Sequence, residues 1–543
     1  MMKSALWNAP FAIGLALAFA MLTPASASVA PPPTTEEARA NLAEIGSIEK
    51  LTLAQLVNGI DDGVLNSEAI TEAYLKRIAE IDDAGPTLNA VIATFPDALD
   101  QARALDAELR GGKYRGLLHG IPILLKDNIE AKGPLATTAG SLALKDNVTN
   151  RDAPFVARLR EAGMVILGKT NLSEWANIRS NQSTSGWSAI GGLTKNPHAL
   201  DRNACGSSSG SAVAVAASLT AGAIGTETDG SVTCPAGVNG IVGFKPTVGL
   251  VSRRYIVPIS HSQDTAGPMA RSVRDVALIL SAMAGSDPED PATDKADNYK
   301  TYYAGNLGDD ALNGVRVGVI RAPNVSKDVF EVALAKLSEA GATLVPLDVS
   351  FIDRRKIGMG EFKVLLTELK ADMAAYLQGL PADTKIPHKT LADIIAFNKA
   401  TPAELEHFDQ SIFETANNAS GLDDPGYLEA RKTSLKLAGA YGLDRLFNEN
   451  SVEIIVAQTN GPAWLSTLGK GDKFTGPSAS GLPAVAGYPH LTVPMGMARG
   501  LPVGLSFIGR KWDDHRVLRY GHAFEQVSKA RRAPSYAPSK PAE

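Results

Sequence analysis

The sequence predicts an α/β protein built on a single large mixed β-sheet core that helices cover on both faces. Three observations predict this fold. The chain has 543 residues, of which 44% are hydrophobic and 20% charged, a composition that suits a globular protein with a large core. Helical patterns alternate with short apolar runs, as they do in sheets covered by helices. No internal repeat divides the chain, so one large domain is favoured over several small ones.

The first elements alternate in type along the chain. Residues 67–83 carry apolar side chains at helical spacing and begin with serine, which favours helix starts. The apolar run GIPILLKDNI, residues 120–129, has the length of a strand. FVARLREAG and MVILGKT, which together span residues 155–170, predict a helix and then a buried strand. SAVAVAASLTAGA, residues 211–223, is small and apolar enough to form a tightly packed helix.

The second half continues the alternation around a helical middle. Residues 276–285 predict a helix, and residues 351–447 are rich in helical patterns and charge. The other predicted elements are the strands GVRVGVI (314–320) and ATLVPLDV (342–349), the helix VFEVALAKLSEAG (329–341), and the buried strands IIVAQT (454–459) and HLTVPMG (490–496).

The N-terminus has the pattern of a secretory signal. Lys3 precedes an apolar run over residues 9–22, and the small residues Ala-Ser-Ala at 25–27 provide a cleavage site. The run is shorter than the roughly 20 residues needed to span a bilayer. We therefore expect residues 1–27 to be a signal peptide, and the protein to be periplasmic or secreted, with no stable membrane anchor. An uncleaved anchor is the alternative.

Three further segments complete the predicted organisation. Residues 28–49 are expected to be a solvated leader, residues 50–530 the main domain, and residues 531–543 a flexible tail. The formal net charge of −5 leaves no basic footprint, so a nucleic-acid partner is not expected.

Cysteine and histidine usage constrains the site chemistry. The two cysteines, Cys205 and Cys234, are too few for a disulfide scaffold and are expected to be small buried thiols, with a disulfide as the alternative. The eight histidines have no metal-ligand spacing, so neither a metal nor a cofactor is expected.

Three short motifs match other classes of enzyme. GMVILGKT, residues 163–170, fits a phosphate-binding loop, but its bulky apolar residues predict a strand instead. GSSSG, residues 206–210, fits a nucleophile elbow with Ser208 as the nucleophile, although the preceding NPHALDRNAC is polar and turn-like. Its base would be one of the downstream histidines His261, His490, His515 and His522. SIEK, residues 47–50, fits the S-x-x-K pattern of penicillin-recognising enzymes without its companion motifs.

A different set of motifs, with two serines and a lysine, extends over most of the chain. CGSSSGS begins at Cys205, and GTETDGS, which ends at Ser231, follows it after one helix and one turn. Upstream, Lys126 ends an apolar strand in PILLKDNI, where a lysine packs poorly. These motifs resemble the amidase signature family of serine hydrolases, and SEWANIRSN and ETDGSVTCPA are most similar to its bacterial peptide amidases. The resemblance covers residues 50–530 and also includes NGIVGFKPTVGLVSR and SQDTAGPMARS.

The resemblance implies a role for each residue of the motifs. Ser231 is the acyl-forming nucleophile, Ser207 is the bridging serine with a cis peptide bond to the preceding residue, and Lys126 is the base. Backbone N–H groups form the oxyanion hole, at Thr228, Asp229, Gly230 and Ser231. Cys205 and Ser209 depart from the family by replacing glycines of its core motif.

The proposed base must be neutral to take a proton from serine. The pKa of lysine, about 10.4 in model peptides, must then fall by about 3. Burial in an Ile-Leu-Leu strand can lower it that far. Asp127 would oppose this shift if it faced Lys126, but neighbouring residues of a strand point to opposite faces.

The resemblance implies that the enzyme hydrolyses a carboxamide to an acid and ammonia through an acyl-enzyme. Its expected substrate is a small molecule or short peptide with an amide group, most specifically the C-terminal amide of a peptide. Three alternatives are an amidase of other aliphatic or aryl amides, the amidase subunit of a tRNA-dependent amidotransferase, and an exported binding protein with an inactive hydrolase fold. The intact set of Lys126, Ser207 and Ser231 argues against the last of these.

Overall fold

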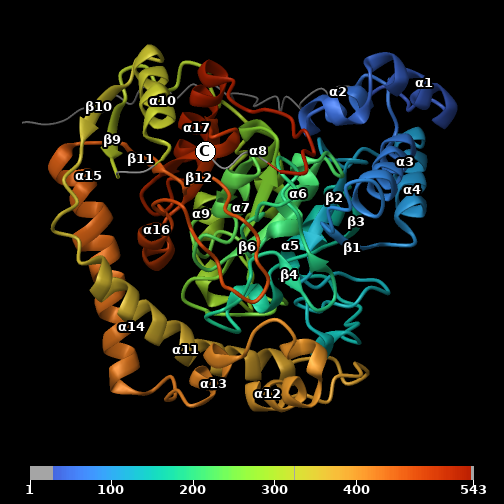
Figure 1. Ribbon diagram of the computed structural model, residues 1–543. Coiled ribbons are helices and arrows are strands. Elements are labelled where there is room, and N and C mark those ends of the chain that lie inside the picture. The colour runs from blue at the N-terminus through green and yellow to red at the C-terminus, as the bar shows by residue number, and fades with distance from the viewer. Residues whose placement is uncertain (1–28, 323–324, 540–543) are drawn as a thin grey trace, which may run out of the picture.

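Eleven strands form one mixed sheet through the centre of the molecule (Figure 1). The computed structural model describes residues 29–322 and 325–539, so the predicted signal peptide lies outside the described residues. In spatial order the strands are β1 (Val91–Thr94), β3 (Val165–Thr170), β2 (Pro122–Lys126), β6 (Gly222–Glu227), β8 (Thr265–Ala270), β7 (Val242–Lys245), β12 (His490–Ala498), β13 (Leu501–Ile508), β11 (Ile454–Gln458), β9 (Arg316–Ile320) and β10 (Thr343–Pro346). A separate hairpin pairs β4 (Trp187–Ser188) with β5 (Gly192–Leu193).

The direction of strand pairing changes across the sheet. β2 runs parallel to β3 and β6, and β9 runs parallel to β10 and β11. The remaining pairs, including β6 with β8 and β12 with β13, are antiparallel. The prediction of one mixed sheet is therefore confirmed.

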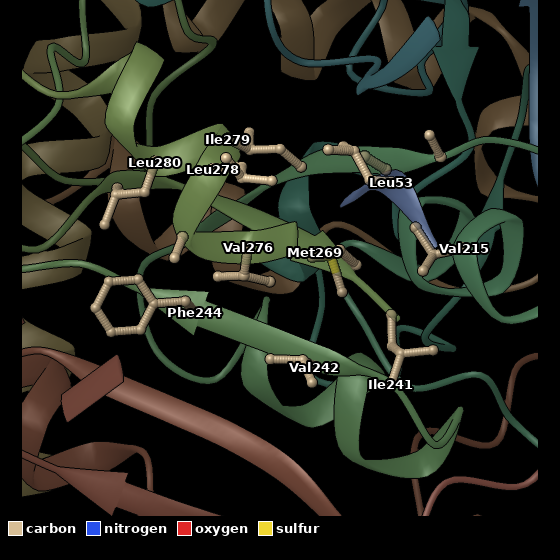
Figure 2. Packing of buried hydrophobic residues seen from close by; sticks show 14 of the residues in the cluster. Leu53, Val215, Ile241, Val242, Phe244, Met269, Val276, Leu278, Ile279 and Leu280 are labelled. Carbon is tan, nitrogen blue, oxygen red and sulfur yellow. The ribbon is translucent and has the colours of Figure 1, made fainter. Parts of the chain in front are cut away.

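Helices cover both faces of this sheet. Residues an odd number apart in a strand point to opposite faces. On β6, a Cβ at Gly222 would meet Ile279 of α8 (Val273–Met283), whereas a Cβ at Gly225 would meet Ser208, which caps α6 (Ser209–Ala216). Figure 2 shows Val276 and Ile279 of α8 packed beside Met269 and Phe244 of the sheet, at the centre of the largest buried cluster.

The other helices lie around this core. They are α1 (Thr35–Ile45), α2 (Leu53–Asp61), α3 (Ser67–Arg77), α4 (Ala98–Arg110), α5 (Pro154–Glu161), α7 (Thr233–Val238), α9 (Ala296–Tyr299), α10 (Lys327–Glu339), α11 (Arg354–Gln378), α12 (Leu391–Ala400), α13 (Ser411–Asn417), α14 (Pro425–Ala438), α15 (Asp444–Asn450), α16 (Gly481–Ala486) and α17 (Asp514–Ser528). The predicted helical middle, α11 to α15, extends from one edge of the molecule along its lower side in Figure 1. In the described part of the chain, no helix has the length and apolar character needed to cross a membrane.

Two predicted segments differ in the structure. The helix predicted over residues 211–223 ends at Ala216, because Ser218 adopts a left-handed backbone with φ 58° and Gly222 already begins β6. The segment 28–49 is not a fully solvated leader, since it contains α1, whose Ala38 and Leu42 are buried.

The C-terminal segment lies against the body of the protein as far as the structure describes it. Within the predicted tail, the N–H of Tyr536 donates to the carbonyl of Pro197, and the carbonyl of Ala537 accepts from the N–H of Leu200, both at 2.9 Å. The Tyr536 hydroxyl also accepts a hydrogen bond from Arg77 at 3.1 Å. These contacts hold residues 536–537 to the domain.

Candidate active site

Lys126 is the last residue of β2, and its side chain is fully buried. Its Nζ donates hydrogen bonds to Ser207 Oγ at 2.7 Å and to Thr226 Oγ1 at 2.8 Å. Burial lowers the pKa of Lys126 to about 7, although the negative charges of Asp264 and Glu227 act to raise it. A neutral lysine is therefore accessible near neutral pH, as the proposed chemistry requires.

Asp127 points away from Lys126, as the alternation along a strand predicts. Its Oδ2 accepts hydrogen bonds from the backbone N–H and the hydroxyl of Thr138, and its Oδ1 lies 3.8 Å from Lys169 Nζ. Lys169 also donates to Thr137 Oγ1 at 2.9 Å. The lysine of the phosphate-loop pattern is thus a buried residue of β3 that anchors a neighbouring loop.

Ser207 lies in a buried turn before α6. Its peptide bond with Gly206 is cis, as the family resemblance implies. A Cβ at position 206 would lie 2.1 Å from Ser173 Oγ, so any larger residue there would have to displace the Ser173 side chain. Because the Ser207 hydroxyl accepts the hydrogen bond from Lys126, the first link of the predicted proton relay is present.

Ser208 is held in the protein core. Its Oγ donates to the Thr226 carbonyl at 3.1 Å and accepts from the Thr226 N–H at 3.2 Å, and the side chain is fully buried. Residues 194–204, which precede the motif, form turns and isolated bridges instead of the strand that a nucleophile elbow requires. The geometry therefore does not support Ser208 as a nucleophile.

The loop from Thr228 to Ser231 follows β6. Gly230 has φ 79°, a left-handed conformation that glycine adopts without steric cost. In the part of the chain that the structure describes, no backbone carbonyl accepts a hydrogen bond from the N–H groups of Thr228, Asp229, Gly230 or Ser231. Unpaired donors in this loop fit the oxyanion hole that the sequence predicts.

Ser231 lies beside the bridging serine segment. It is 8% exposed, and its carbonyl accepts a hydrogen bond from the Ser208 N–H at 3.1 Å. Glu227 fixes the following turn, because its Oε2 accepts from the N–H of Val232 at 2.8 Å. Within the described residues, the Ser207 hydroxyl is hydrogen-bonded to lysine and not to Ser231, so the second link of the relay stays a prediction.

A cavity of about 430 Å³ contains Ser231 in its wall. The segment over residues 172–187 contributes Ile178 to this wall, and the helical middle contributes Leu365 of α11. A third wall, which sequence reasoning did not place, comes from residues 460–480 and includes the aromatic pair Trp464 and Phe474. The cavity is therefore largely apolar and directly adjoins the candidate nucleophile.

A disulfide joins the two serine motifs. Cys205 and Cys234 are bonded to each other, with their Cα atoms 6.0 Å apart, so the expectation of two buried thiols was wrong. Their spacing of 29 residues did not reveal the pairing, because α6 and β6 return the chain to the same place only in the folded structure. The bond connects the turn that carries Ser207 to α7, the helix that follows Ser231.

Removing this disulfide should destabilise the protein. Replacing both Cys205 and Cys234 by serine should lower the free energy of unfolding by about 2–4 kcal/mol, because the cross-link restricts the unfolded chain. Denaturant unfolding with and without reductant measures the effect. Reductant should destabilise the native protein and leave the double variant unchanged. Two freely alkylated cysteines in the oxidised native protein would contradict the assignment.

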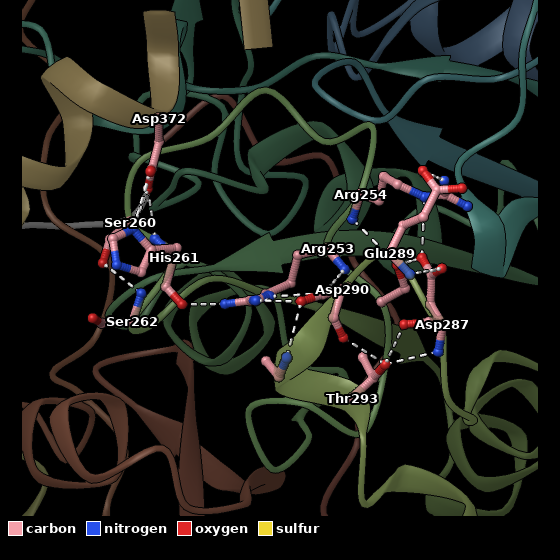
Figure 3. Close-up of polar contacts among 12 residues, drawn as sticks. Arg253, Arg254, Ser260, His261, Ser262, Asp287, Glu289, Asp290, Thr293 and Asp372 are labelled. Carbon is pink, nitrogen blue, oxygen red and sulfur yellow. Dashed lines mark hydrogen bonds and ion pairs between the residues drawn. The ribbon is translucent and has the colours of Figure 1, made fainter. Parts of the chain in front are cut away.

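The loop over residues 259–264 is hydrogen-bonded to the loop from Thr228 to Ser231. Asp264 accepts a hydrogen bond from the Thr228 hydroxyl at 2.5 Å, and Gln263 Nε2 donates to the Thr228 carbonyl at 3.3 Å. Figure 3 shows the same loop tied to α11, where the ring of His261 lies beside Asp372. Hydrogen bonding to Asp372 raises the pKa of His261.

One cluster among the described residues has the residue types of a metal site. Ligand atoms of His261, Glu368 and Asp372 all lie within 4.8 Å of one another. Each ring nitrogen of His261 faces a carboxylate, with Nδ1 3.0 Å from Asp372 and Nε2 3.3 Å from Glu368. This arrangement suits a protonated imidazole that clamps the loop to α11.

Sequence reasoning missed several residues that organise the site. Thr226, Glu227, Gln263 and Asp264 all lie within motifs that carry the family resemblance, GTETDGS and SQDTAGP. Each could have been singled out as a polar residue in a buried segment. Their partners could not have been identified, since Thr228 and Asp264 are 36 residues apart in the chain.

Comparisons with known proteins identify the family of the chain. The family described as Amidase matches residues 69–518. A probable amidase of Arabidopsis thaliana is 39% identical over 503 residues, which cover 90% of this chain and 92% of the plant protein. A glutamyl-tRNA(Gln) amidotransferase subunit of a Synechococcus strain is 34% identical, over 87% of this chain and 92% of that protein.

Solved structures lead to the same family. The native peptide amidase from Stenotrophomonas maltophilia is 48% identical, with a TM-score of 0.85, and the match covers 90% of this chain and 99% of that one. A peptide amidase in complex with the competitive inhibitor chymostatin matches with a TM-score of 0.86, also at 48% identity and over 90% and 99% of the two chains. The chain belongs to the amidase signature family and is an amide-hydrolysing enzyme.

Proposed function

We propose that this enzyme hydrolyses the C-terminal carboxamide of short peptides to a free acid and ammonia, through an acyl-enzyme on Ser231. The observation that carries the proposal is the 2.7 Å hydrogen bond between Lys126 Nζ and Ser207 Oγ, beside the loop that bears Ser231. The similarity to peptide amidase structures at 48% identity supports the substrate class.

The first half of the reaction forms the acyl-enzyme. Neutral Lys126 takes the proton of Ser207, and Ser207 takes the proton of Ser231 as its Oγ attacks the amide carbon. The carbonyl oxygen becomes an oxyanion, which accepts hydrogen bonds from unpaired N–H groups of residues 228–231. Stabilisation of this charge lowers the barrier to the tetrahedral intermediate.

The second half releases both products. The proton on Lys126 returns through Ser207 to the amide nitrogen, the C–N bond breaks, and ammonia leaves. Water then attacks the acyl carbon, gives a proton to the same relay, and the bond to Ser231 Oγ breaks. The free acid departs, and the serine regains its proton.

The burial of the relay favours a small leaving group. Lys126 and Ser207 are both fully buried, and they must deliver a proton to the departing nitrogen. Ammonia needs little space beside them, whereas the amine end of an internal peptide bond would have to carry a chain into the same buried region. This steric argument supports hydrolysis at the terminal amide and not at internal bonds.

The disulfide bears on where the enzyme acts. Disulfides form and persist in oxidising compartments such as the periplasm or the extracellular space. The bond between Cys205 and Cys234 therefore supports the proposal that the enzyme is exported, with residues 1–27 as its signal peptide. Export would place it where peptides from outside arrive.

A pair of matched peptides tests this function. After incubation with an amidated peptide and its free-acid twin, mass spectrometry should show conversion of the amide to the acid and no change in the twin. Internal fragments of either peptide, or turnover confined to small non-peptide amides, would contradict the proposed substrate. Because the twin differs only at its terminus, it controls for contaminating peptidases.

A further inference from the structure

Asp229 is the only charged residue in the cavity wall, counting the described residues that line it. It lies two positions before Ser231, and its side chain is exposed on the side that faces the cavity. The rest of the wall is apolar or uncharged, with Trp464 and Ser480 as examples. One carboxyl group therefore determines the charge that a substrate meets beside the nucleophile.

The Asp229 carboxyl is held by neutral partners. It interacts with Ser480 and with the carboxyl of Glu361, which projects from α11. Gln263 Nε2 donates to Glu361 Oε1 at 2.9 Å and so fixes the second carboxyl in turn. Two carboxyl groups in contact do not both ionise at neutral pH, so the pair shares one proton.

The shared proton resides on Glu361. Burial and the neighbouring charge of Asp229 raise the pKa of Glu361 to about 8. Asp229 faces the open cavity, but the protein around it still desolvates its carboxyl and raises its pKa to about 6. At pH 7 the Glu361 carboxyl is therefore protonated, and the Asp229 carboxyl is ionised. The negative charge lies on the member of the pair that lines the cavity.

Two other charged groups influence Asp229 without lining the cavity. Glu227 of β6 raises the pKa of Asp229, and Lys245 of β7 lowers it. Both side chains are buried, at 1% and 0% exposure. A ligand in the cavity can therefore contact the charge of Asp229 directly, whereas protein atoms separate it from the charges of Glu227 and Lys245.

We infer that the Asp229 carboxylate is a specificity determinant that selects uncharged carboxamides over carboxylates. An amide –NH2 can donate a hydrogen bond to this carboxylate, whereas a carboxylate of almost the same shape is repelled by it. Because shape cannot separate substrate from product here, charge must do so. The same repulsion would expel the acid that the reaction forms. This inference rests on the proposed function.

Binding to an inactive variant tests the inference without turnover. In the Ser231→Ala protein at about pH 8, calorimetry should show that an amidated peptide binds about 10- to 100-fold more tightly than its free-acid twin, as expected for one close charge pair. Adding Asp229→Asn, which keeps the shape and removes the charge, should reduce this preference to about threefold or less. Adding Glu361→Gln, which replaces an uncharged partner by another, should preserve the preference.

A pH series gives a second readout in the Ser231→Ala protein itself. Between about pH 8 and pH 5, Asp229 gains a proton while the peptide carboxyl, with a pKa near 3.5, stays ionised. The acid should therefore bind more tightly as pH falls, and the Asp229→Asn protein should lack this gain.

Unchanged selectivity in Asp229→Asn, or an acid affinity that does not respond to pH, would overturn the inference. If the active enzyme turns over only non-peptide amides, the proposed substrate fails, and the same comparison with that amide and its acid still decides the role of Asp229.

Discussion

Ser231→Ala should lower amide hydrolysis by at least about 10⁴-fold, the loss typical of removing a catalytic serine. The variant has no hydroxyl to form the acyl-enzyme, while its fold should be intact because the side chain lines a cavity. Ser208→Ala should retain substantial activity, since the Ser208 hydroxyl is buried and, among the described residues, is hydrogen-bonded only to the backbone of Thr226. Initial rates on one amidated peptide compare the two variants.

The Ser231→Ala and Ser208→Ala variants distinguish between two interpretations of CGSSSGS, as the segment with the bridging serine or as a nucleophile elbow. If the motif were a nucleophile elbow, Ser208→Ala would be inactive and Ser231→Ala would retain activity. Thermal unfolding of each variant provides the control, because loss of the Ser208 hydrogen bonds should cost about 1–3 kcal/mol without preventing folding. An inactive, folded Ser208→Ala enzyme would show that the nucleophile has been misassigned.

Lys126→Ala should lower the acylation rate by about 10²- to 10⁴-fold, the usual contribution of a general base. No other described side chain with a depressed pKa is hydrogen-bonded to Ser207. Lys126→Arg should be similarly inactive, because arginine stays protonated and cannot accept the serine proton. Single-turnover measurements with both variants test the role of the base.

The same lysine should set the pH dependence of the native enzyme. Neutral Lys126 is the active form and its pKa is about 7, so kcat/KM should rise with pH through this value and level off above it. The rise should disappear in the residual activity of Lys126→Ala. Near-native rates in Lys126→Ala, or an acid limb that persists unchanged in it, would remove lysine from the mechanism.

The candidate catalytic residues could be singled out because each lies in a local pattern. Lys126 interrupts an apolar strand where packing gives it no reason to occur, and the period of a strand correctly separates it from Asp127. The family resemblance implies a cis peptide bond before Ser207, and the structure has one between Gly206 and Ser207. Resemblance to the family then identified the two serines together.

Features that depend on long-range contacts could not be predicted in the same way. The disulfide and the Asp229–Glu361 pair join residues that only the folded chain brings together. Helix α1 did leave a local signal, since Thr34 and Glu37 form a capping box, but the neighbouring prolines and charges favoured a solvated segment. The buried side of α1 is visible only once its packing is known.

The central claim is that Lys126 and Ser207 activate Ser231, and covalent labelling tests it most directly. A fluorophosphonate reacts with an activated serine, and peptide mapping by mass spectrometry then locates the adduct. The account predicts one adduct per chain, on Ser231, and slow or no labelling of Lys126→Ala. An adduct on Ser208, or equally fast labelling after the lysine has been removed, would contradict it.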